Sequence, residues 1–269
     1  MTDAVADARG SASRLQDSRA LRTLARVGFA TNGLIHVLIG GIALGVAAGG
    51  GGEADQGGAL GQLASRPGGA AVLWVVVVGL WALGLFQLLE AALVRGTDKE
   101  AWADRAKEGG KGVAYLAVGV TAFTFARGGS SDSSDQTQSL SSRLLATPGG
   151  VVLLVVLALA VVAIGVYFVV KGLRQEFRQD LVVPSGTAGR MTVALGVVGY
   201  VAKGVAIAVV GVLFAVAAIT ADPEEASGLD GALKTLAGLP AGVVVLSVVA
   251  IGLIAFGLYS VVRARRARL

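Results

Sequence analysis

The sequence predicts an all-α, polytopic membrane protein whose six transmembrane helices form three parallel helical hairpins in a pseudo-threefold bundle. Three observations support this fold class. Of the 269 residues, 54% are hydrophobic and only 15% are charged, a composition unlike that of water-soluble domains. The apolar residues gather into six long runs, and the runs recur with one internal spacing. Because lipid offers no partners to backbone N–H and C=O groups, each run is expected to be a helix.

The apolar runs differ in how well they match a bilayer, whose hydrocarbon core a helix crosses with about 20 apolar residues. The runs cover residues 27–48, 70–94, 112–126, 150–170, 191–219 and 241–262. The third run is short unless its flanks contribute, and the fifth is longer than one crossing requires. Before the third run, Thr97 and Glu100 have the spacing of a capping box. This predicts a separate short interfacial helix with Trp102 at headgroup level.

A repeated pattern links the even-numbered runs, which open at Pro67, Pro148 and Pro240. Relative to each proline, a leucine stands four residues before, a glycine 17 after, an aromatic residue 19 after and a charged residue 23 after. One register therefore relates all three runs. The residues in these positions are Leu63, Leu144 and Leu236; Gly84, Gly165 and Gly257; Phe86, Tyr167 and Tyr259; and Glu90, Lys171 and Arg263.

The odd-numbered runs share a second pattern, a glycine followed seven residues later by another glycine. Seven residues are nearly two helical turns, so the two glycines lie on one helix face. Small residues let membrane helices approach closely. We therefore expect helix packing at these glycines and at those of the even-numbered runs. The pairs are Gly33 and Gly40, Gly112 and Gly119, and Gly204 and Gly211.

These patterns divide the chain into a tail and three repeats. Residues 1–21 are expected to form a disordered cytoplasmic tail. The repeats cover 22–106, 107–185 and 186–269, and the third ends in a basic tail. Repeat 2 has Lys107 where the other two have Gly28 and Gly199, so its first helix is expected to begin differently.

The repeats resemble the bacterial membrane family called Domain of Unknown Function 1206. The resemblance rests on "RVGFATNGLIHVLIG", "KGVAYLAVG" and "GYVAKGVAIAVVG", together with the proline, glycine and aromatic spacing of the even-numbered runs. It covers about residues 22–264. It implies tandem two-helix membrane repeats, and it implies no established chemistry.

The distribution of Lys and Arg predicts the orientation. Eighteen of the 23 cations lie in the N-terminal segment, the second and fourth loops and the C-terminal tail, against four in the other loops. By the positive-inside rule, both termini are expected on the cytoplasmic side of a bacterial inner membrane. Because the cations border apolar runs, we expect membrane lipids with anionic headgroups as partners and no nucleic acid.

Polar residues inside the apolar runs form the candidate site. Asn32 aligns with Lys111 and Lys203 near the cytoplasmic edge, and with the charged even-run positions this predicts an inner polar collar. For Lys111, Lys171 and Arg263 we expect snorkelling, in which the charged end reaches the headgroups. The candidate intramembrane residues are Asn32, His36, Glu90 and Lys203.

His36 and Glu90 each allow two interpretations. His36 lies deeper in the membrane and on the same helix face as Asn32. It is either a hydrogen-bonded packing residue or part of a proton relay through Asn32 towards Glu90. Glu90 is correspondingly either half of a structural ion pair or a carboxylate that handles protons.

The residue inventory argues against familiar enzyme sites. With one His and no Cys, the chain has no bis-His haem site and no thiolate metal site, and no zinc-protease, Ser-His-Asp or phosphate-loop motif is present. We therefore expect no enzyme activity, no cofactor and no metal. The favoured function is a non-catalytic membrane scaffold or accessory subunit, with a membrane-protein partner or a second copy left open. The alternative is a carrier or channel for a small solute or ion, including a proton-coupled one.

Overall fold

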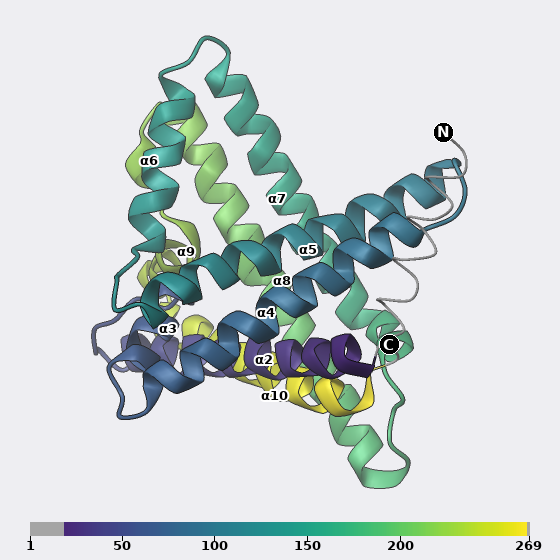
Figure 1. Ribbon diagram of the computed structural model, residues 1–269. Helices are drawn as coiled ribbons and strands as arrows, with labels where there is room; N and C mark the ends of the chain where they lie inside the picture. The colour runs from purple at the N-terminus through teal and green to yellow at the C-terminus, as the bar shows by residue number, and fades with distance from the viewer. Residues whose placement is uncertain (1–18, 268–269) are drawn as a thin grey trace. The chain divides into compact units, whose positions relative to one another are not determined.

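A computed structural model describes residues 19–267, and every regular element in that range is a helix (Figure 1). The described residues divide into two compact units. The first contains residues 19–32, 63–129 and 260–267, and the second contains residues 33–62 and 130–259. Most of the predicted tail at 1–21 lies outside the described residues, but α2 (Arg19–Ala47) already begins at Arg19.

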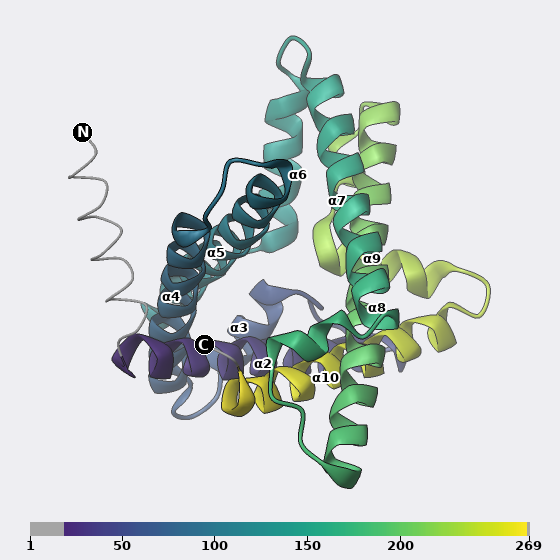
Figure 2. The same ribbon diagram turned by 90° about the vertical axis from the view of Figure 1, so that its right-hand side faces the viewer.

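In the first unit, α4 (Gly69–Leu93) lies along α5 (Lys99–Ala126), as both views show (Figures 1 and 2). The N-terminal half of α2 and the last turns of α10 (Gly242–Arg266) contribute to the same hydrophobic core, whose largest members are Phe29 and Phe86. Phe86, which the repeat pattern singled out, is only 1% exposed.

In the second unit, α7 (Gly150–Leu173) lies along α8 (Gly186–Thr220), and the C-terminal half of α2 lies along α10 (Figures 1 and 2). A short helix precedes each even-numbered span and contains the repeated leucine. These short helices are α3 (Gln56–Ala64), α6 (Ser133–Leu145) and α9 (Gly228–Gly238). The second unit also contains two 3₁₀ helices, η1 (Glu176–Asp180) and η2 (Pro223–Glu225).

Five described helices are long and apolar enough to cross a membrane: α2, α4, α7, α8 and α10. The third predicted span is part of α5, whose first half is highly charged. Its apolar residues 112–126 would extend about 22 Å at 1.5 Å per residue, which is short of a bilayer core of roughly 30 Å. Six crossings are therefore not established by helix length and composition.

The segment before residue 112 also differs from its prediction. It is no separate interfacial helix, because α5 runs without a break from Lys99 to Ala126. The N-cap is Asp98 and not Thr97, since the Asp98 carboxylate accepts the Ala101 backbone N–H at 3.0 Å. A capping Asp satisfies a free N–H of the first turn, and the charged residues that follow simply extend the helix. Trp102 is 63% exposed on its surface.

One turn opens all three proline-started spans. The residue after the proline is left-handed in each copy, with φ of 78° at Gly68, 78° at Gly149 and 59° at Ala241. The next N–H donates to the carbonyl of the residue before the proline, at 2.8, 2.9 and 2.7 Å. Proline followed by a left-handed residue is the pattern of a type II turn. The repeated proline is therefore explained by a turn that directs the chain from each short helix into the next span.

Candidate functional site

Three glycine pairs bring an even-numbered span of one repeat against the odd-numbered span of the next. A methyl group placed on the even-span glycine of each pair would come within about 3.0 Å of the partner helix, and the same holds for a methyl on Gly112 or Gly204. The same register is used each time. The pairs are Gly84 and Gly112 between α4 and α5, Gly165 and Gly204 between α7 and α8, and Gly257 and Gly33 between α10 and α2.

The second glycine of each odd-numbered span packs in the same way. An added methyl on Gly40 would meet the Ala250 carbonyl at 2.6 Å, and one on Gly211 would meet the Val162 backbone N at 2.7 Å. On Gly119 it would enter the Trp81 ring. The opposing residues Trp81, Val162 and Ile254 each stand three positions before the paired glycine of their span. The three interfaces thus agree over two helical turns.

Contacts within a repeat use other glycines, which sequence reasoning missed. Gly28 on α2 lies against Gly79 on α4, and Gly252 on α10 lies against Ala202 on α8. Gly79 and Gly252 both stand five residues before the paired glycine of their span, so the register contained this signal. Gly199 lies against Phe256, and Gly28 lies against Leu83, which holds the equivalent position in repeat 1. Lys107 replaces this glycine in repeat 2.

His36 and Lys203, two of the candidate residues, both contact the ring of Phe256. The His36 and Phe256 ring centroids are 4.7 Å apart, and the Lys203 ammonium lies 4.3 Å from the Phe256 centroid. Lys203 also lies 5.3 Å from the Phe168 centroid. His36 is buried. A cation over an aromatic face is stabilised by the ring quadrupole, most strongly where water is excluded.

An aromatic cluster extends from Phe256 and includes a residue that sequence reasoning missed. Phe177, on η1 between the fourth and fifth spans, is fully buried and stacks on Tyr200 with centroids 5.3 Å apart. The Tyr259 hydroxyl donates to the Phe177 carbonyl at 3.3 Å. Tyr259, which the repeat pattern singled out, is therefore a core residue. Phe177 lies in a connecting segment of mostly polar residues, so its burial could not be read from hydrophobicity. The one signal in the sequence is Gly196, because a side chain there would collide with the Phe177 ring.

Two of the cations for which snorkelling was expected, Lys171 and Arg263, make contacts inside the protein. Lys171 is 4% exposed, and its ammonium lies 2.8 Å from an Asp180 carboxylate oxygen, so it stays inside the protein. It also lies 5.4 Å from the Tyr200 ring centroid. Arg263 stacks over Phe29 at 4.4 Å. An acid close in sequence and an aromatic on the adjacent helix explain why these cations do not need the headgroups.

The interface between repeats 1 and 2 has acidic groups where the other two interfaces have a cation over an aromatic ring. Glu90 aligns with Lys171 and Arg263, and Glu108 aligns with Tyr200 and Phe29. Glu90, Asp104 and Glu108 line one surface groove of about 390 Å³.

Internal contacts occupy two of these acids, Glu90 and Glu108. The Gln87 amide donates to Glu90 at 2.9 Å. The Lys111 ammonium lies 2.7 Å from Glu108, so Lys111 forms an ion pair beside the groove.

The four candidate residues fall into both units. Asn32 and Glu90 belong to the first unit, whereas His36 and Lys203 belong to the second and share Phe256. Within residues 19–267, no three His, Asp or Glu side chains are placed to hold a metal ion.

An acidic cluster lies among the short helices on the predicted outer face. Asp230 accepts the Ala54 backbone N–H at 2.8 Å and pairs with Lys234 at 2.6 Å. Asp55 is 1% exposed and accepts the Gly58 N–H at 2.9 Å. Burial, followed by neighbouring carboxylates, raises the pKa of Asp55, and the same two causes raise the pKa of Glu53.

One protein family matches three parts of the chain. Residues 27–93, 108–175 and 198–267 each match the family described as Domain of Unknown Function (DUF1206). The chain is also 26% identical over 250 residues to the uncharacterized protein YxxB of Bacillus subtilis (strain 168), covering 90% of each chain. No solved structure matches the chain. Apolar membrane-type helices in three copies of one unit, each matching this family, lead to one conclusion: the chain is a multi-pass membrane protein that belongs to the family Domain of Unknown Function 1206.

Proposed function

We propose that this protein is a non-catalytic membrane scaffold or accessory subunit. The observation that carries the proposal is the set of three equivalent glycine interfaces, in which backbones approach without room for a methyl group. Such contacts give membrane helices tight packing without polar groups. Internal contacts also occupy the charged positions, as Lys171 with Asp180 and Lys203 with Phe256 illustrate. Both features favour a helical assembly without a water-filled path, which acts by offering its outer surface to a partner.

The finer architecture belongs to the same proposal. Repeat 1 contacts repeat 2, repeat 2 contacts repeat 3 and repeat 3 contacts repeat 1, which supports a pseudo-threefold arrangement with six crossings. The cation distribution supports cytoplasmic termini in a bacterial inner membrane. The proposed partners are anionic lipids and either another membrane protein or a second copy of this chain.

Transport of a small ion or solute is the second candidate. The feature that favours it is the placement of His36 and Lys203 on one aromatic ring inside apolar spans, because ionisable groups at such depth often mark ion pathways. A histidine titrates near neutral pH and could carry protons there.

Flux and cross-linking measurements separate the two candidates. The full chain in sealed vesicles with an imposed pH gradient is expected to give no proton flux above that of empty vesicles. A pH-dependent flux that His36→Phe or Glu90→Gln abolishes would replace the scaffold proposal with transport.

Cross-linking tests the scaffold directly. Leu159 on α7 is 65% exposed, so a photo-reactive residue there should cross-link in native membranes to a protein. Adducts to lipid alone from Leu159, and equally from exposed Val156 one turn away, would count against a scaffold.

A further inference from the structure

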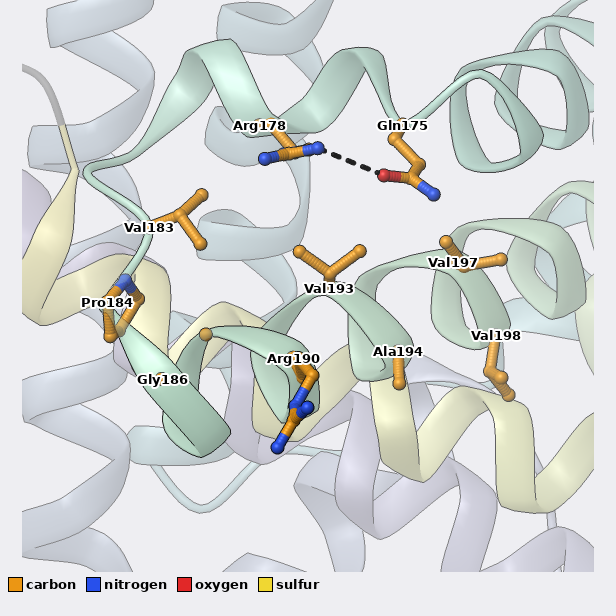
Figure 3. Close-up of a pocket in the computed structure, with 11 residues that line it drawn as sticks. Gln175, Arg178, Val183, Pro184, Gly186, Arg190, Val193, Ala194, Val197 and Val198 are labelled. Atoms are coloured by element: carbon orange, nitrogen blue, oxygen red, sulfur yellow. Dashed lines mark hydrogen bonds between the residues drawn. The ribbon is translucent and has the colours of Figure 1, made fainter.

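The start of α8 forms one side of a groove of about 660 Å³, a volume typical of small-ligand sites (Figure 3). Its other side comes from η1 and the connector that leads into α8. The groove is open on one side. Val193 and Val197 lie along its α8 wall, Arg178 and Gln175 face them from η1, and Val183 and Pro184 lie at the end where the connector enters α8. Both walls belong to the second unit.

Two arginines give this apolar groove a positive charge. Arg178 lines it from η1 and Arg190 lines it from the first turns of α8, and no lining residue is acidic. Nearby acids have other partners: Asp180 pairs with Lys171 at 2.8 Å and Glu176 lies 4.0 Å from Arg174. Arg178 and Arg190 make only long contacts of 3.3 and 3.4 Å, to Gln175 and Thr187. Their charges therefore remain available to an anion.

The length of α8 places the groove at the membrane surface. The helix has 35 residues, whereas one crossing requires about 20. A crossing that ends near Thr220 leaves roughly 15 residues at the start of α8 outside the hydrocarbon core. These residues include the groove wall from Gly186 to Val198.

We propose that this groove binds one anionic glycerophospholipid, with its phosphate at Arg178, its glycerol and upper acyl chain along the valines, and Arg190 at the rim adding positive charge. Guanidinium groups match phosphate oxygens in bidentate geometry. Val198, half-exposed on the next turn, continues the apolar wall towards the membrane. A soluble phosphate would use the arginines but would leave the valine wall without a contact, so a lipid is the occupant that uses both features.

Native mass spectrometry of the full chain in detergent tests the proposal, with phosphatidylglycerol and phosphatidylcholine as probes. We expect one phosphatidylglycerol retained in preference to phosphatidylcholine. Each guanidinium removed should weaken retention about fivefold, which corresponds to roughly 1 kcal/mol per basic residue near a membrane surface. The variant is Arg178→Gln with Arg190→Gln, and the matched control is Arg174→Gln with Arg265→Gln, which removes two exposed cations outside the groove.

A second variant tests the apolar wall without a change of charge. Val193→Trp fills the groove and should also release the lipid, whereas Val212→Trp, at an exposed site on the same helix, should not. Unchanged retention in the double-arginine variant, or in Val193→Trp, would overturn the proposal. So would full displacement of phosphatidylglycerol by millimolar glycerol phosphate, since that result would assign the site to a soluble anion.

Discussion

The backbone of Gly165 on α7 lies directly against the backbone of Gly204 on α8. A methyl group on Gly204 would meet the Gly165 carbonyl at 2.6 Å, and one on Gly165 would meet the Gly204 carbonyl at 2.7 Å. The equivalent glycines meet between α4 and α5 and between α10 and α2. Because the contact occurs three times in one register, its energetic weight can be tested at any copy.

Gly40 and its neighbour Gly41 provide a matched test of this packing. Gly40 faces the Ala250 carbonyl, whereas a methyl on Gly41 would meet nothing within 4 Å. Gly40→Leu should therefore lower the free energy of unfolding by about 1 to 3 kcal/mol through overpacking. Gly41→Leu should cost much less, since both substitutions change helix propensity equally. Thermal unfolding in detergent measures both, and equal stabilities would show that the close approach carries no energetic weight.

The type II turns predict a stabilising substitution. Ala241 is left-handed, with φ of 59°, where repeats 1 and 2 have glycine. A Cβ in that region costs roughly 1 to 2 kcal/mol, which a glycine avoids. A glycine also makes the unfolded chain more flexible, and this entropy offsets part of the stabilisation. Ala241→Gly should thus raise the free energy of unfolding by a few tenths to about 1 kcal/mol. Gly149→Ala, at the equivalent turn, should change it in the opposite direction, and a loss in both variants would contradict the argument.

The buried acid Asp55 predicts a pH dependence of stability. Its pKa is raised in the folded protein from the ordinary 3.8, chiefly by burial, so the folded state favours the protonated form. Protonated Asp55 therefore contributes to the free energy of unfolding. This contribution is fully present below the ordinary pKa and is lost as the pH rises through the raised pKa of the folded protein. Asp55→Asn keeps an acceptor for the Gly58 N–H but cannot ionise.

Unfolding measured between pH 3 and pH 7 tests the Asp55 prediction. The advantage of Asp55→Asn over the native chain should grow as the pH rises through this window, because only the native carboxyl becomes charged. The change is confined to Asp55 if Asp135→Asn, on the exposed first turn of α6, shows no such trend. An advantage that shrinks with rising pH would mean that burial does not oppose ionisation here.

The ion pair of Lys171 and Asp180 should behave as a buried pair. The Lys171 side chain is 5% exposed and the Asp180 side chain 18%. Lys171→Met leaves a carboxylate beside the aromatic cluster and should cost about 3 kcal/mol of stability. Lys171→Met with Asp180→Leu should recover much of that loss, because no charge is then left without its counterion. Additive losses in the double variant would show that the two groups act independently.

The glycine spacing in the sequence coincides with close helix contacts, because a close backbone approach demands glycine at a fixed spacing, as at Gly84 and Gly112. The sequence pattern could not predict the burial of Phe177, because that burial depends on η1 folding back so that Phe177 reaches Tyr200 and Tyr259. Snorkelling of Lys171 failed for a related reason: the acid that pairs with it lies nine residues further along, beyond the end of the span. Spacing within helices is readable from sequence, whereas contacts made by connecting segments depend on the fold.

The last prediction concerns α5, the helix on which the number of crossings depends. Its apolar half is short, but the charged half continues the same helix and Gly112 and Gly119 pack it along α4, which is itself long enough to cross. If α5 crosses with α4, Thr97 and Ser131 lie on opposite sides of the membrane. The chain has no Cys, so Thr97→Cys and Ser131→Cys can each be labelled singly with a membrane-impermeant maleimide. We expect Ser131→Cys to react in intact cells and Thr97→Cys to react only after the membrane is opened, and labelling of both from one side would exclude six crossings.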